Sequence, residues 1–161
     1  MAAGGNSERF SIRQASAADA EAIRDVYLSA RLSAMPWLPL LHAPDEVKTW
    51  LATYVIPFSK VFVAEIGGRV IGFAALKDDM LDHLYVRPDC QRGGTGAALL
   101  HAVKTESQER LRLYTFARNT LAKRFYEKHG FRALAFSDGK RNQEREPDIL
   151  LELDIGRGSV S

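Results

Sequence analysis

The residues best suited to chemistry lie at positions 91–96, which read Gln-Arg-Gly-Gly-Thr-Gly. Three glycines in four residues leave a backbone without Cβ atoms, so a ligand can approach it closely. Residues 97–100 are strong helix formers, and the first N–H groups of a helix have no intrahelical partners and lie at its positive end. Such a turn binds an anion, most often a phosphate, and Arg92 adds a positive charge.

Two common phosphate-binding patterns do not fit this turn. A P-loop ends in Gly-Lys-Ser/Thr, whereas Gly96 is followed by Ala97 and Ala98. The dinucleotide-binding turn has a small residue three positions after its second glycine, where this chain has Leu99. What remains is Gln-x-x-Gly-x-Gly, directly after a strand that ends in Val-x-Pro. An ordinary glycine-rich turn between a strand and a helix is the alternative interpretation.

Together with the β-forming residues 84–86 before it and an apolar helix after it, this pattern resembles the acetyl-CoA site of the GCN5-related N-acetyltransferases, the GNAT superfamily. Residues 119–131 fit Asn-x-x-Ala-x-x-Phe-Tyr-x-x-x-Gly-Phe, which is similar to a second signature of that superfamily. The resemblance covers most of residues 61–153. The segment Met-Pro-Trp-Leu-Pro at 35–39 is similar to one in bacterial members of unassigned substrate.

The other elements follow from hydrophobic periodicity and from breakers. Gly67 and Gly68 predict a hairpin turn, and Pro57 is expected to end the second helix. The expected strands are 10–14, 61–66, 69–76, 81–86, 111–117, 131–136 and 149–154. The expected helices begin at 16–19, at 44, after the glycine turn and at 119. This order, β-α-α-β-β-β-α-β-α-β-β, and the resemblance predict an α/β (α+β) GNAT fold with a mixed, mostly antiparallel sheet of about seven strands, splayed between strands 4 and 5.

Length and composition restrict the class of protein. At 161 residues the chain fits one domain, expected over 8–155, with loose tails at 1–7 and 156–161. The net charge of +2 is mild, so nucleic acid is not implied, and no apolar run is long enough for a membrane span. Cys90 is the only cysteine, which suits a reducing cytoplasm.

The resemblance implies a place for acetyl-CoA as co-substrate. In the GNAT arrangement the pantetheine chain enters the gap between strands 4 and 5, where the backbone of Leu84 and Val86 would bind it and the Val86 N–H would point at the thioester carbonyl. Tyr126 would be the acid for the leaving thiolate, or else a packed amphipathic aromatic. Asn119 is a preferred helix N-cap and would also contact the CoA arm. The implied cofactor-binding residues are Leu84, Tyr85, Val86, Gln91, Arg92, Gly93, Gly94, Thr95, Gly96, Asn119 and Tyr126.

The acceptor side is less defined. Asp82 is favoured as the general base, with His83 beside it on the opposite face of the strand, where it could instead be an ordinary strand histidine. Trp37, in a loop too rich in proline for regular structure, is expected either in the core or in the wall of an acceptor pocket that Asp82 shares and that His42 can reach. The polar stretch 137–148 is either a solvated loop or one that reaches over the acceptor site or a dimer partner. The histidines and the cysteine have no metal-ligand spacing, so no metal is expected.

The predicted function is therefore N-acetyl transfer from acetyl-CoA to an amine, by direct attack in a ternary complex. A GNAT-like domain that binds acyl-CoA as a sensor without turnover is the alternative. The acceptor is a small molecule or a protein amine, and a homodimer is possible. Nothing in the sequence chooses the acceptor.

Overall fold

The computed structural model describes residues 9–91 and 93–156. The expected tails at 1–7 and 156–161, except for Gly156, and the proposed phosphate contact of Arg92 lie outside the described residues. The strands are β1 (Ser11–Gln14), β2 (Lys60–Ile66), β3 (Arg69–Lys77), β4 (Met80–Val86), β5 (Arg110–Phe116), β6 (Arg132–Ser137) and β7 (Asp148–Asp154). The α-helices are α2 (Ala20–Ala34), α3 (Pro44–Trp50), α4 (Ile56–Phe58), α5 (Thr95–Thr105) and α6 (Thr120–Lys128). Short turns of other helix types are η1 (Ala17–Asp19), η2 (Leu51–Val55) and η3 (Pro88–Cys90).

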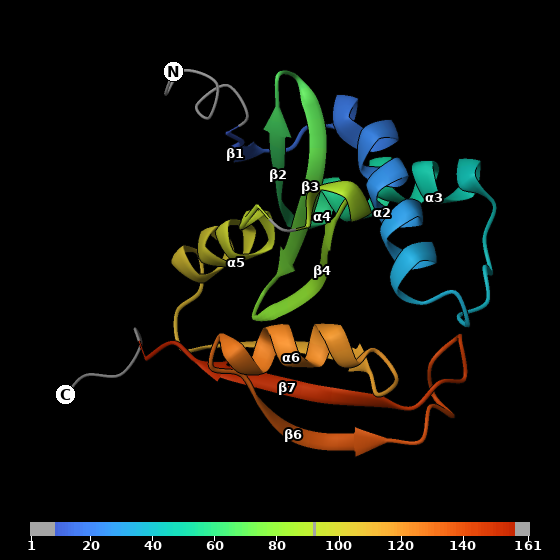
Figure 1. Ribbon diagram of the computed structural model, residues 1–161, viewed down its shortest axis with the longest axis vertical. Helices are drawn as coiled ribbons and strands as arrows, with labels where there is room; N and C mark the ends of the chain where they lie inside the picture. Colours follow the sequence, from blue (N-terminus) through green and yellow to red (C-terminus); the bar gives the residue numbers. More distant parts are fainter. Residues whose placement is uncertain (1–8, 92, 157–161) are drawn as a thin grey trace.

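The seven strands form one sheet in the order β1-β2-β3-β4-β5-β7-β6. Every neighbouring pair is antiparallel except β4 and β5, which are parallel. These two strands pair only at Met80 and Arg112, so β4 leaves β5 from its first residue onward (Figure 1). The predicted fold, with its mixed sheet and its splay between strands 4 and 5, is confirmed.

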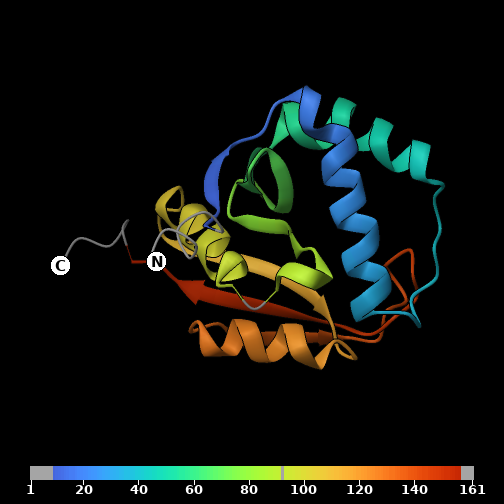
Figure 2. The ribbon, with the colours of Figure 1, turned by 45° about the horizontal axis from the view of Figure 1, so that its top comes forward.

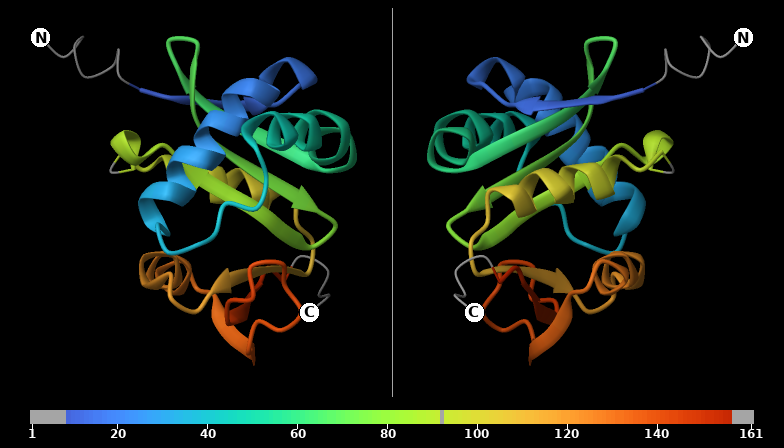
Figure 3. Two further views of the ribbon diagram at one scale, coloured as in Figure 1. Left: turned by 90° about the vertical axis from the view of Figure 1, so that its right-hand side faces the viewer. Right: turned by 90° about the vertical axis from the view of Figure 1, so that its left-hand side faces the viewer.

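Helices cover both faces of the first half of the sheet. Helices α2 and α3 lie on one face and α5 lies on the other, while α6 runs beside β7 on the second half (Figures 1 and 3). Two apolar clusters fill these interfaces. One holds Ile23, Val47, Leu51 and Phe73 between the sheet and α2–α3, and the other holds Leu99, Leu100, Leu113 and Leu151 on the α5 side. None of the helices in the described part of the chain is long and apolar enough to cross a membrane.

The turn between β2 and β3 forms where it was predicted. Gly67 and Gly68 have φ of 53° and 83°, and a two-residue hairpin with positive φ at both positions follows the right-handed twist of its strands. Glycine adopts this conformation without the steric cost that a Cβ atom brings.

The second helix continues one residue beyond its predicted end at Pro57. Helix α3 passes into the wider turn η2 and then into α4, which ends at Phe58. In this turn the Ile56 N–H donates to the Leu51 oxygen, five residues back. A widened turn shifts the hydrogen-bond ladder, so the missing N–H and the ring of Pro57 fit in the last turn.

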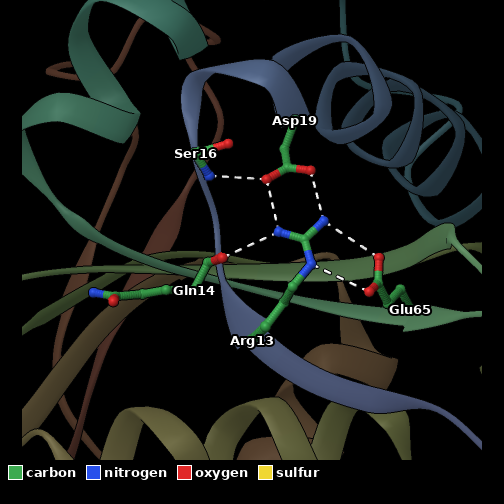
Figure 4. A network of polar contacts seen from close by, with 5 residues as sticks. All are labelled: Arg13, Gln14, Ser16, Asp19 and Glu65. Atoms are coloured by element: carbon green, nitrogen blue, oxygen red, sulfur yellow. Dashed lines mark hydrogen bonds and ion pairs between the residues drawn. The ribbon is translucent and has the colours of Figure 1, made fainter.

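The start of α2 is held to the sheet by an ion-pair network (Figure 4). The Asp19 carboxylate accepts a hydrogen bond from the Ser16 N–H at 2.8 Å, which caps the start of the helix predicted to begin at 16–19. Arg13 of β1 binds both Asp19 oxygens at 2.8 and 2.9 Å and also pairs with Glu65 of β2. The Arg13 guanidinium lowers the pKa of Asp19, so this carboxylate stays ionised.

Candidate functional site

The gap between β4 and β5 exposes the backbone of β4 near its end. The Arg87 N–H donates to the Ile71 oxygen of β3 at 2.7 Å. Because backbone groups alternate in direction along a strand, those of Leu84 and Val86 point away from β3 and toward the gap. The Gln91 side chain donates to the Val86 oxygen at 3.1 Å, which ties the glycine turn to the same edge.

The glycine turn opens α5 with a left-handed residue. Gly94 is the N-cap of the helix and has φ 81°. A Cβ atom built at Gly93 or Gly94 would meet nothing within 4 Å, so the space in front of the turn is open. At Gly96 a Cβ atom would lie 3.5 Å from the Phe125 ring, where α6 approaches the turn. The free N–H groups of the first turn of α5 therefore face open space that an anion can enter.

One cavity of about 390 Å³ joins the turn, the gap and α6. It brings together most of the predicted cofactor-binding residues. These are Leu84, Tyr85, Val86, Gln91, Gly94, Gly96, Asn119 and Tyr126. Helix α2 closes one side with Ala30 and Ala34. Of the other predicted residues, Gly93 flanks the opening and Thr95 is buried beneath it.

Tyr126 presents a buried phenol to this cavity. Its ring packs against those of Phe125 and Phe131, with centroids 5.2 and 5.3 Å away. Burial, with a smaller effect from Tyr85, raises the pKa of Tyr126 well above its usual value. The phenol therefore keeps its proton at neutral pH and can donate it. Asn119 caps α6 by accepting a hydrogen bond from the Ala122 N–H at 3.2 Å, so its expected N-cap role is confirmed.

These residues fit acetyl-CoA. The open space before the two glycines suits a pyrophosphate on the N-terminal N–H groups of α5, and the outward backbone groups of β4 suit an extended pantetheine chain. The donor set is made of backbone N–H groups and a phenol. Among the described residues no cluster of three or more His, Cys, Asp or Glu side chains could hold a metal ion.

A second cavity of about 530 Å³ lies on the α2–α3 face. Four segments form it: α2, the loop 35–43, α3 and the loop 138–147. The two loops come together at one edge of the cavity (Figures 1 and 2). Its lining residues are Tyr27, Arg31, Pro39, Leu40, Leu41, His42, Glu46, Val47, Trp50, Gln143 and Glu144. Gln143 and Glu144 of the loop 138–147 line this cavity, while the interpretation that the loop reaches over the acceptor site stays a prediction.

Arg31 lies between the two cavities. Its guanidinium donates to the Tyr85 hydroxyl at 3.3 Å and to Glu144 at 3.3 Å, and it lies 4.9 Å from the centre of the Tyr27 ring. Tyr85 lines the first cavity, whereas Arg31, Tyr27 and Glu144 line the second. A molecule in the second cavity therefore lies next to the strand that borders the gap.

Trp37 does not line the second cavity, although other residues of its loop do. The Trp37 ring packs edge-on against Phe116, with centroids 6.2 Å apart, and the Arg118 guanidinium stacks over it at 4.1 Å. Trp37 therefore fastens the loop to the carboxyl end of β5. The neighbouring residue His42 does line the cavity, with Nε2 3.5 Å from the Gln143 side-chain oxygen.

Asp82 and His83 have different surroundings. His83 is beneath the second cavity among the rings of Tyr27, Trp50 and Tyr85, and its Nδ1 is buried without a hydrogen-bond partner in the described part of the chain. Burial, with Arg31 as a smaller cause, lowers the pKa of His83 to about 4. Asp82 is exposed and lies at an irregularity in the β3–β4 pairing; partial desolvation of its carboxyl raises its pKa although Lys77 opposes the shift. In the described residues neither Asp82 nor Trp37 lines either cavity, so the two are not brought together there.

Of the polar and aromatic side chains of the second cavity, His42 was predicted from the sequence to reach an acceptor pocket. Tyr27, Arg31 and Trp50 were not singled out. The only local signal is the spacing of Tyr27 and Arg31, four residues apart and hence on one face of α2. Nothing nearby indicates that Glu144, 113 residues later, meets Arg31.

Comparisons with known proteins agree with this geometry. The acetyltransferase (GNAT) domain family matches residues 57–133. The fold is similar to that of apo YjaB from Escherichia coli, with TM-score 0.74 and 21% identity over 89% of this chain and 97% of that one. It is also similar to YncA from Salmonella typhimurium with its cofactor acetyl-CoA (TM-score 0.71, 22% identity, 94% and 96% covered). The PaiA N-acetyltransferase from Thermoplasma acidophilum, in complex with coenzyme A, gives TM-score 0.68 and 18% identity over 91% and 99%. A comparison with curated protein sequences finds no match.

Proposed function

We propose that the chain is an acyltransferase of the GNAT superfamily and that it transfers an acetyl group from acetyl-CoA to an amine by direct attack within a ternary complex. The observation that carries this proposal is the single cavity in which the splayed edge of β4, the glycine turn and Tyr126 meet. Acetyl-CoA would supply the acetyl group as a thioester.

The backbone would hold and polarise the co-substrate. The N–H groups of Gly94 to Gly96 and their neighbours would bind the pyrophosphate, and Leu84 and Val86 would bind the pantetheine chain along the edge of β4. The Val86 N–H would donate to the thioester carbonyl, where negative charge grows during attack. These roles are supported by the open space at Gly94 and by the direction of the β4 backbone groups.

In the proposed reaction the ammonium group of the acceptor first loses one proton. A bond then forms between its nitrogen and the acyl carbon while the carbon–sulfur bond breaks. The nitrogen loses a second proton, and the leaving thiolate gains one from the Tyr126 phenol. The phenol then regains a proton from water, so that one proton is released overall. Tyr126 lines the cavity, and burial raises its pKa, so the phenol is protonated at neutral pH and available as a donor.

Asp82 remains our proposed proton acceptor. Its carboxylate is on β4 two residues before Leu84, and its raised pKa brings it closer to the working range of a general base. Because it does not line the described cavities, we propose that it receives the proton through water.

A broad screen of amines with a thiol-release readout tests the function. We expect turnover of acetyl-CoA that depends on an amine and yields its N-acetyl derivative. Saturable binding of acetyl-CoA, without release of the CoA thiol in the presence of any amine, would instead identify a sensor.

A further inference from the structure

We infer that the acceptor is an α-amino acid with an apolar side chain and that Arg31 binds its carboxylate, an inference that rests on the proposed acetyl transfer. The site is the 530 Å³ cavity on the α2–α3 face. The family match names no acceptor.

The first argument is that Arg31 is held in place by contacts that leave some hydrogen-bond donors of its guanidinium unused. Its hydrogen bonds within the described residues are one to Tyr85 and one to a single oxygen of Glu144, both at 3.3 Å. Arg13, by contrast, grips both oxygens of Asp19 at 2.8 and 2.9 Å (Figure 4). A guanidinium has five N–H donors in a fork that matches a carboxylate, so Arg31 keeps donors for a second anion.

The second argument is burial. The side chains of Arg31 and Glu144 are only 17% and 18% exposed. A cation so far removed from water requires close anionic partners, and one carboxylate at 3.3 Å satisfies it weakly. The other carboxylate of the cavity, on Glu46, accepts the Ala43 N–H at 2.8 Å and caps its own helix. A carboxylate on the acceptor would therefore complete the surroundings of Arg31.

The third argument concerns the charge of the acceptor. A simple ammonium group placed against Arg31 would be repelled by the guanidinium, although the Glu144 carboxylate beside it offsets part of this repulsion. An α-amino acid carries its own compensating carboxylate one carbon away from the amine. Because Arg31 contacts Tyr85, whose neighbour Val86 borders the gap, an amine attached to that carboxylate is directed toward the place of acyl transfer.

The rest of the cavity suits an apolar side chain. Leu40, Leu41, Val47 and Trp50 form its wall, and Leu40 is 72% exposed without a ligand. Covering such surface contributes about 25 cal/mol per Å² of apolar area. The acceptor would thus be recognised by an ion pair between its carboxylate and Arg31 and by apolar contacts between its side chain and the wall of the cavity.

Matched pairs of acceptors test this inference. L-phenylalanine is compared with 2-phenylethylamine, and L-leucine with 3-methylbutylamine, by kcat/KM for thiol release from acetyl-CoA. Each pair differs only in the carboxylate. For the wild-type protein we expect the amino acid to be preferred by about 10- to 100-fold, the range for a hydrogen bond between charged groups.

Three variants assign the preference to Arg31. Arg31→Gln should lose it. Comparing the ratio of the variant with the ratio of the wild type cancels differences in the intrinsic reactivity of the amines, which are the same for both proteins. Arg24→Gln, on the same helix but outside the cavity lining, should keep it. Glu144→Gln breaks the same ion pair while keeping the guanidinium, so it should also keep the preference.

The outcomes are separable. Equal or better use of the amines lacking a carboxylate by the wild-type protein overturns the inference and leaves the proposed function standing. Loss of the preference in Glu144→Gln as well as in Arg31→Gln also overturns it, because the ion pair would then matter only for structure. If none of the acceptors tested supports thiol release from acetyl-CoA, the proposed function and this inference are overturned together. The wild-type ratio requires no variant, so the test holds even if Arg31→Gln does not fold.

Discussion

The two cavities on either side of the Tyr85–Arg31 contact are built in opposite ways. The cavity proposed for acetyl-CoA draws much of its surface from one continuous piece of chain, β4 through the start of α5, and its proposed contacts are mostly backbone groups. The cavity proposed for the acceptor draws on four separate segments and on side chains. A backbone site leaves a local signature in the sequence because it needs glycine and a strand edge. A side-chain site leaves none.

This difference predicts which kinetic parameter each substitution changes, and the largest effect is expected at Tyr126. Tyr126→Phe keeps the buried ring and removes the proton donor, so kcat should fall by about 100-fold or more. Acetyl-CoA affinity, measured by calorimetry, should change little. Wild-type turnover in this variant would remove Tyr126 from the acid role.

The next prediction concerns His83, which lies beneath the cavity proposed for the acceptor, and the way in which the free energy of unfolding depends on pH. Its pKa in the folded protein is about 4, below the ordinary 6.5, so the unfolded chain binds the proton more tightly. The stability that the neutral form provides is complete above pH 6.5 and is lost as pH falls toward 4. Over this window the wild type should lose about 3 kcal/mol of unfolding free energy relative to His83→Phe.

Urea unfolding of both proteins at several pH values measures this loss. Parallel curves for the wild type and His83→Phe would show that His83 is not held neutral in the folded protein.

The glycine turn offers a matched pair of variants. Gly94 and Gly68 have φ of 81° and 83°, and a Cβ atom at either meets nothing within 4 Å. Gly94→Val and Gly68→Val should therefore impose similar backbone strain. Only Gly94→Val should weaken acetyl-CoA binding, by roughly 10- to 100-fold, the equivalent of one or two lost phosphate contacts.

Calorimetric titration with acetyl-CoA, after a thermal melt of each variant, makes this comparison. Equal affinity in the two folded variants would refute the placement of the pyrophosphate at the turn.

The smallest expected effect tests how the proline-rich loop is fastened. Arg118→Gln removes the guanidinium stacked on Trp37, a contact worth about 0.5 to 1 kcal/mol at such a site. We expect a small fall in stability and a modest rise in acceptor KM, with acetyl-CoA affinity unchanged. A change in acetyl-CoA affinity would show that the two cavities are not as independent as their construction indicates.

The difference between local backbone geometry and contacts among distant side chains also decides what could be predicted from the sequence. The hairpin at Gly67 and Gly68, the turn before α5 and the N-cap at Asn119 are dictated by local geometry, and all were predicted. The passage of the second helix through Pro57 was not, because a widened turn has no clear local pattern. Trp37 could be placed in a loop, but its contact with Phe116 and Arg118 depends on how β5 lies beneath that loop.

Amide hydrogen exchange with and without acetyl-CoA tests the central claim most directly, namely that the co-substrate binds along the splayed edge of β4. The account predicts that saturating acetyl-CoA slows exchange at Leu84, Val86 and the amides of residues 93–96, while Gly67 and Gly68 in the distant hairpin exchange as before. Unchanged exchange at Leu84 and Val86 in a protein that calorimetry shows to be saturated would contradict it.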